Sequence, residues 1–115
     1  MANEVTTEAE IETPEDLAKR FAELTAKWKE ETRFSSKAGQ MAQHTAYREI
    51  VAMGARAVPL ILADLEKNGG HWFIALAEIT GANPVPKESR GYIEQMTAAW
   101  IAWGRDQGYR WDRAF

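Results

Sequence analysis

Large apolar residues recur along this chain at spacings of three and four, and this period decides what the chain can fold into. The clearest runs are Leu17, Phe21, Leu24 and Trp28 near the start and Ile93, Met96, Trp100 and Trp103 near the end. Such spacing places the side chains on one stripe of an α-helix, whereas a half-buried strand alternates at every second residue. No stretch alternates convincingly in that way, so the sequence predicts an all-α protein.

Glycine and proline divide this pattern into helices. We expect helices over residues 13–32, 37–53, 57–68, 71–80 and 92–105. Gly54 and Gly81 each follow the last residue of a periodic run, which is the usual place for a left-handed helix end. Pro84 and Pro86 predict a stiff surface loop over residues 81–91, because proline lacks the N–H that a helix or central strand needs. The expected architecture is a compact bundle of about five helices with a helix hairpin at its centre.

Length and composition fit one globular domain. The chain has 115 residues, of which 45% are hydrophobic and 27% charged, and single cores of roughly 100 to 150 residues are common. Residues 1–12 carry Val5 and Ile11 as their only large apolar residues among several glutamates. Such a segment buries too little to offset the entropy of ordering. We therefore expect a disordered acidic leader at 1–12 and a single helical domain at 13–115.

The same composition restricts the chemistry and the compartment. There is no cysteine, which excludes disulfides, thiolate metal sites and cysteine nucleophiles and suits a reducing cytoplasm. The start of the chain is acidic and polar, whereas a secretory signal begins with basic residues followed by an apolar stretch. We expect a cytoplasmic protein that does not enter a membrane, and the sequence leaves its oligomeric state open.

A motif in the middle of the chain supports a resemblance. A run of helix type ending in Gly54 leads through Ala57-Val58-Pro59 into a second run with paired aliphatic residues, and Trp72-x-x-Ala75-Leu76-x-x-Ile79 follows. This pattern resembles a HEAT repeat, with about one and a half units between Tyr47 and Thr80. The resemblance implies stacked helix hairpins that bind proteins, and sometimes nucleic acids. Since a solenoid needs about three repeats for stability, the flanking helices should act as caps.

A longer string also resembles a known group. His71-Trp72-Phe73-x-Ala75-Leu76-x-x-Ile79-Thr80-Gly81-x-Asn83-Pro84-Val85, with a Trp-x-x-Trp helix downstream, is similar to a family of small uncharacterised bacterial proteins. The resemblance implies a bacterial source and no particular activity. An adaptor, antitoxin or immunity-like role would suit a bacterial protein of this size.

Candidate catalytic groups are sparse. His44 and His71 are the only histidines, and neither has a second histidine or a cysteine at ligand spacing. We expect His44 on a polar helix flank and His71 at a helix start. The carboxylates nearest the apolar segments are Asp64, Glu66 and Glu78, and solvated helix positions explain them better than paired acid–base work. We predict no enzyme activity, no metal and no cofactor, with a small-ligand site at His71 or Glu78 as the remaining alternative.

Arginines interleaved with aromatic residues form the best case for a functional surface, because such side chains anchor protein interfaces. The candidate partner-binding residues are Asn83, Arg90, Tyr92, Arg105, Tyr109, Arg110, Trp111 and Arg113. They predict a non-enzymatic protein-interaction module that binds a protein partner. The alternative is a nucleic-acid-binding regulator that uses the basic aromatic C-terminal end. A net charge of −3 opposes it, since phosphate binding usually needs a basic face.

Overall fold

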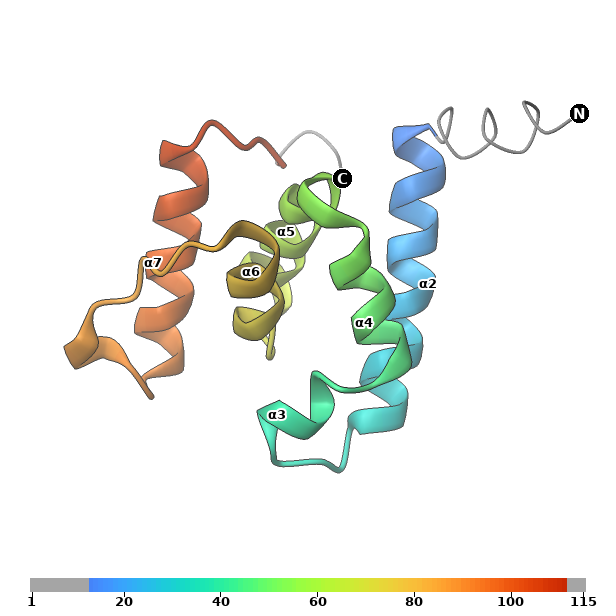
Figure 1. Ribbon diagram of the computed structural model, residues 1–115, viewed down its shortest axis with the longest axis horizontal. Coiled ribbons are helices and arrows are strands. Elements are labelled where there is room, and N and C mark those ends of the chain that lie inside the picture. Colours follow the sequence, from blue (N-terminus) through green and yellow to red (C-terminus); the bar gives the residue numbers. More distant parts are fainter. Residues whose placement is uncertain (1–12, 112–115) are drawn as a thin grey trace, which may run out of the picture.

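The computed structural model describes residues 13–111, and within this range it contains helices and no strands (Figure 1). The segments in chain order are α2 (Pro14–Thr32), α3 (Ala38–Met41), α4 (Thr45–Ala52), the 3-10 helix η1 (Gly54–Ala57), α5 (Val58–Asn68), α6 (Phe73–Thr80), the 3-10 helix η2 (Lys87–Ser89) and α7 (Ile93–Asp106). The all-α prediction is confirmed. The acidic leader, residues 1–12, lies outside the described residues.

Helix α2 begins where the sequence places it. The Thr13 side chain accepts a hydrogen bond from the Asp16 backbone N–H, and the Asp16 carboxylate accepts one from the Thr13 N–H. This reciprocal pair satisfies two backbone donors that a helix start leaves open. The predicted stripe then faces the core, with Leu17, Phe21 and Trp28 all buried.

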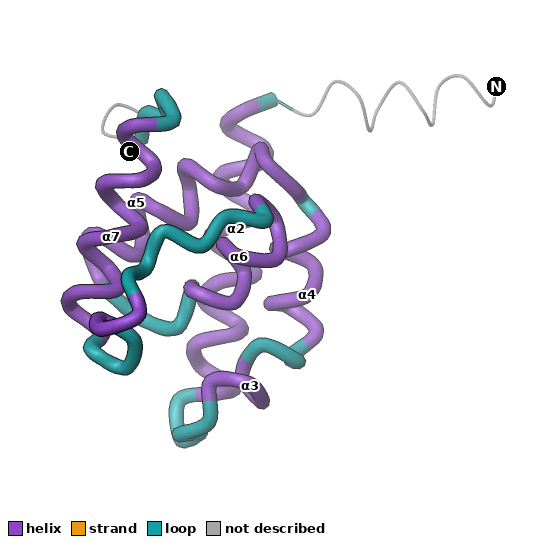
Figure 2. Tube along the Cα trace, turned by 60° about the vertical axis from the view of Figure 1, so that its left-hand side comes forward, coloured by secondary structure: helices purple, strands orange, loops and turns teal. Residues whose placement is uncertain are grey.

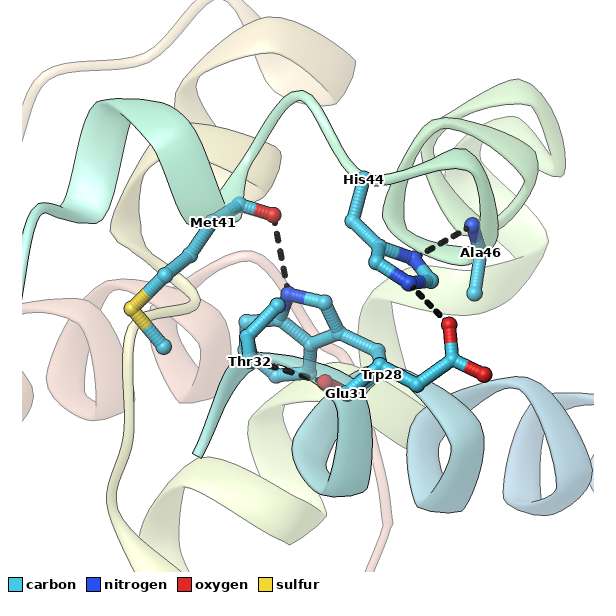
Figure 3. A network of polar contacts seen from close by, with 6 residues as sticks. All are labelled: Trp28, Glu31, Thr32, Met41, His44 and Ala46. Atoms are coloured by element: carbon cyan, nitrogen blue, oxygen red, sulfur yellow. Dashed lines mark hydrogen bonds and ion pairs between the residues drawn. The ribbon is translucent and has the colours of Figure 1, made fainter. Parts of the chain in front are cut away.

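The single helix predicted over residues 37–53 is wrong in one respect, because it is interrupted between α3 and α4. The Met41 carbonyl accepts Trp28 Nε1–H at 2.9 Å and the backbone N–H of His44, three positions on, at 3.2 Å, whereas in a continuous helix it would accept from the residue four positions on. His44 then adopts an extended backbone, and its Nδ1 accepts from the Ala46 N–H at 3.0 Å (Figure 3). His44 is thus the N-cap of α4, where we had expected a residue on a helix flank.

The predicted turns of the central region are confirmed. Gly54 has a φ of 74° after α4, and Gly81 has a φ of 72° in the left-handed region after α6. Both positions suit glycine, because a Cβ disfavours positive φ. Pro59 lies in the first turn of α5, where its missing N–H costs no hydrogen bond. The chain therefore reverses direction through η1 between α4 and α5.

The helices form two groups that meet at the centre of the molecule. Helix α4 packs against α2 and α6, and α5 packs against α7 and α6 (Figure 1). Four aromatic rings fill the first group: Trp72 stacks on Phe21 and Tyr47 and lies 4.7 Å from the Trp28 ring centroid. Within residues 13–111 no helix is both long and apolar enough to cross a membrane.

Helix α7 follows a long loop that Figure 2 shows running from the end of α6. Trp100 is buried on α7, but Ile93 is 52% exposed, so the apolar stripe predicted for this helix does not face the core along its whole length. After α7 the chain turns back, and Trp111 is buried. This segment therefore packs onto the body through Trp111.

Candidate functional site

Three candidate residues lie on the loop that leads into α7. Asn83, Arg90 and Tyr92 are exposed there, and Ile93 beside Tyr92 is exposed too. The loop is held in place, since Val85 is buried and the backbone N–H groups of Ser89 and Tyr92 donate to carbonyls three residues earlier. Gly91 has a φ of 89°, which lets the chain turn sharply before the helix. We call Arg90, Tyr92 and Ile93 the loop corner.

The remaining described candidates lie at the other end of α7. Arg105 and Arg110 are exposed, and Tyr109 is half-buried against Trp103 with ring centroids 5.8 Å apart. Trp111 is a candidate partner-binding residue from the sequence, but its ring packs on α7 and is only 3% exposed. Arg113 lies outside the described residues.

Trp111 and Arg105 both donate hydrogen bonds to Glu66 of α5. Its carboxylate accepts from Trp111 Nε1–H at 2.9 Å and from the Arg105 guanidinium at 2.8 Å. The guanidinium also lies 4.9 Å from the Trp111 ring centroid. The hydrogen bond from Trp111, together with that from Arg105, lowers the pKa of Glu66 below its usual range. These residues therefore close a contact between α5 and the segment after α7.

The sequence-predicted surface consequently divides into two. Helix α7 has 14 residues and so spans about 20 Å between the loop corner and the Arg105 end. Figure 1 shows the loop and the segment after α7 at opposite ends of this helix. A partner that contacts the loop corner does not need the second group.

Asp64 is the most enclosed of the candidate carboxylates. Burial raises its pKa, but hydrogen bonds from Lys29, Trp72 and Asn68, each 2.8 Å long, outweigh that effect and lower the pKa below its usual range. Its charge is therefore retained and fully partnered. A carboxylate of this kind joins α2 to α5 and is poorly suited to exchange protons near neutral pH.

The small-ligand alternative at His71 or Glu78 gains no support from the contacts of these residues. Glu78 is paired with the Arg48 guanidinium at 2.7 and 2.9 Å, which lowers the pKa of its carboxyl. The His71 carbonyl accepts the Tyr47 hydroxyl at 3.0 Å, so His71 contributes its backbone to the core. In the part of the chain that the structure describes, no group of three His, Cys, Asp or Glu residues could hold a metal ion.

One hollow was missed by the reasoning from sequence. A groove of about 400 Å³ runs between α2 and α5, and we call it the α2–α5 groove. Its lining comprises Ala18, Phe21, Ala22, Thr25, Ala26 and Lys29 of α2 with Leu60, Ala63, Asp64, Lys67 and Asn68 of α5. The spacing of Ala18, Ala22 and Ala26 is the signal that could have revealed it, since residues four apart share a helix face.

No family model, curated protein or solved structure matches this chain. Its function must therefore be argued from its own surfaces. The loop corner and the α2–α5 groove are open surfaces in the described part of the molecule. The Arg105 end is already engaged by Glu66, which leaves less of it for a partner than the sequence suggested.

Proposed function

We propose that this protein is a non-enzymatic protein-interaction module, of the adaptor, antitoxin or immunity-like kind, and that the loop corner is its docking surface. The observation that carries the proposal is the exposure of two adjacent large apolar side chains, Tyr92 at 61% and Ile93 at 52%. Apolar and aromatic residues that lie together on a surface typically anchor protein interfaces. The resemblance to HEAT repeats agrees with such a role by analogy of fold.

The way the corner is held supports the same proposal. Buried Val85 and the short hydrogen-bonded turns of residues 86–92 fix the backbone before a partner arrives. A fixed loop loses less entropy on binding than a flexible one, so more of the contact energy remains as affinity. Arg90 and Glu94 place charges of opposite sign beside the apolar pair. The proposed partner therefore carries an apolar pocket with a rim of mixed charge.

The nucleic-acid alternative has weaker support. It relied on the basic aromatic C-terminal end, where the Arg105 guanidinium is paired with Glu66 and Trp111 is buried. Bases stack on exposed aromatic rings, so a buried indole offers no platform. We therefore place protein binding first.

A matched pair of variants tests the proposal. The tagged chain is used to recover partners from cells that produce it, in wild-type form, as Tyr92→Ser/Ile93→Ser and as Phe34→Ser. Phe34 is the control, because it is 89% exposed and lies between α2 and α3, far from the loop corner in the sequence. We expect quantitative mass spectrometry to show a partner retained by Phe34→Ser and lost by the double variant. Equal recovery of every protein by all three forms would refute the loop corner as the docking surface.

A further inference from the structure

The α2–α5 groove is bounded by small side chains. Ala18, Ala22 and Ala26 form a stripe along α2, and Ala63 lies on the α5 wall. Ala22 and Ala26 are exposed, so the groove is open to solvent along α2. Alanine side chains let another helix approach toward the lower end of the usual 8 to 10 Å between axes, about 8 Å. The shape therefore suits a helix lying along the groove.

The charges at the groove are unevenly distributed. Lys29 and Lys67 lie at one end, around Asp64. The Asp64 charge is already met by Lys29 and by two further donors, whereas Lys67 makes no ion pair with any described residue. This end of the groove is therefore basic. An occupant with carboxylates at the matching position would complement it.

Helix α2 itself carries such carboxylates at its opposite end. Glu15 and Asp16 occupy its first turn and are exposed, and Lys29 lies in its last turn. An antiparallel second α2 would bring its acidic start to the basic end of the groove. Because the two copies are identical, the same contact would form twice.

We propose that the α2–α5 groove binds α2 of a second copy of this chain, antiparallel, with a two-fold axis beside Ala22. In this register Ala22 faces Ala22 of the second copy. Ala18 and Ala26 lie four residues either side of Ala22 and come to the same height along the contact. Glu15 and Lys29 lie seven residues either side, so Glu15 joins the ion pair that the Lys29 ammonium already makes with Asp64. The pattern of alanines and charges along α2 is thus complementary to itself.

Thr25 provides an independent observation at the same place. It lines the groove and is 7% exposed, and its hydroxyl oxygen has no hydrogen-bond partner within the described residues. Buried polar groups without a partner are uncommon in folded proteins. Thr25 and Lys19 lie three residues either side of Ala22, so the dimer places the exposed Lys19 of the second copy at the same height along the groove as Thr25. A donor entering the groove at this height would satisfy the hydroxyl.

Sedimentation velocity of the full chain over a series of concentrations measures the association. We expect a monomer–dimer equilibrium that weakens at high salt, because the Glu15–Lys29 pairs are exposed to screening. Ala22→Arg places two like charges face to face at the axis and should raise the dimer Kd about a hundredfold or more. Ala102→Arg is the control, since Ala102 is an exposed position of α7, and should leave the Kd unchanged. Circular dichroism confirms that both variants fold.

The absence of cysteine from the chain allows a second measurement of the same contact. Facing alanines bring the two Ala22 Cα atoms within the roughly 4 to 7 Å that a disulfide spans. Ala22→Cys should therefore form a covalent dimer on mild oxidation much faster than Ala102→Cys. A chain that remains monomeric at every concentration would overturn the proposal. So would a dimer in which Ala22→Cys cross-links no faster than Ala102→Cys, because the interface would then lie elsewhere.

Discussion

Gly104, in the last turn of α7, offers a sharp test of how closely α7 packs against α5. A Cβ at this position would lie 2.5 Å from Leu62 Cδ1 and 3.3 Å from two ring carbons of Trp111. The replacement of glycine by alanine inside a helix normally stabilises a protein by about 1 kcal/mol. Here the added methyl enters a closed contact, and overpacking costs about 1 to 3 kcal/mol.

The packing around Leu62 decides whether the overpacking cost or the gain in helix propensity is larger. Its side chain is fully buried, so it cannot turn aside without displacing other core residues. We expect Gly104→Ala to lower the free energy of unfolding by about 1 kcal/mol, from an overpacking cost of about 2 set against a propensity gain of about 1. For a domain of this size that loss corresponds to a melting temperature lower by about 4 to 8 °C.

Gly39 provides the matched control for this substitution. It is a helical glycine in α3 with no atom within 4 Å of a built Cβ, and its φ is not positive. Gly39→Ala should therefore stabilise the protein by about 0.5 to 1 kcal/mol. Urea unfolding followed by tryptophan fluorescence measures both variants, and the emission should also shift if Trp111 is displaced.

A double-mutant cycle identifies the clash. In a Leu62→Ala background, which alone costs about 3 kcal/mol, the methyl at position 104 has room, and Gly104→Ala should become neutral or stabilising. If Gly104→Ala stabilised the wild-type chain as much as Gly39→Ala does, the close packing of α7 on α5 would be refuted.

Three further predictions concern the side chains of Tyr47, Asp64 and His44. Burial raises the pKa of Tyr47 from 10.0 to about 12. The protonated hydroxyl therefore makes its full contribution to stability below about pH 10, and the free energy of unfolding should fall by about 1.4 kcal/mol per pH unit between 10 and 12. Tyr47→Phe should remove this slope in alkaline urea titrations. Asp64→Ala leaves the indole N–H of Trp72 without its acceptor and should cost about 2 kcal/mol at pH 7. Because the pKa of Asp64 is lowered by folding, its contribution is present above about pH 4 and is lost as the pH falls further, so the penalty should shrink in acid. His44→Ala removes the cap of α4 and should cost about 1 kcal/mol, measured by thermal melting at pH 7, with Gln43→Ala as the neutral control.

Much of the fold could be predicted from local patterns. The apolar stripe of α2 and the left-handed glycines Gly54 and Gly81 depend on residues that lie close together in the sequence, so the sequence predicts them. The break between α3 and α4 could not be predicted in this way. It is accompanied by a hydrogen bond to the Met41 carbonyl from Trp28, thirteen residues away. Periodicity carries no information about such a distant donor.

The candidate surface was predicted less well, for a related reason. Arginine and aromatic residues in the last part of the chain have the composition of an exposed interface, and the sequence does not reveal that Glu66 of α5 lies opposite them. The exposure of Ile93 was hidden by its correct helical spacing from Met96 and Trp100. Spacing shows that residues share a face, but only the packing of α7 on α5 shows how far along the helix that face is covered.

The contact of α7 with α5 has a mechanical consequence for a protein held by its loop corner. Tyr92 immediately precedes α7, and Trp111 fastens the chain beyond the other end of that helix to Glu66. Helix α7 is therefore fixed at the end opposite the loop corner. On the other side of Tyr92, buried Val85 and the hydrogen-bonded turns hold the loop. A partner bound at Tyr92 thus meets a corner that is held from both directions along the chain.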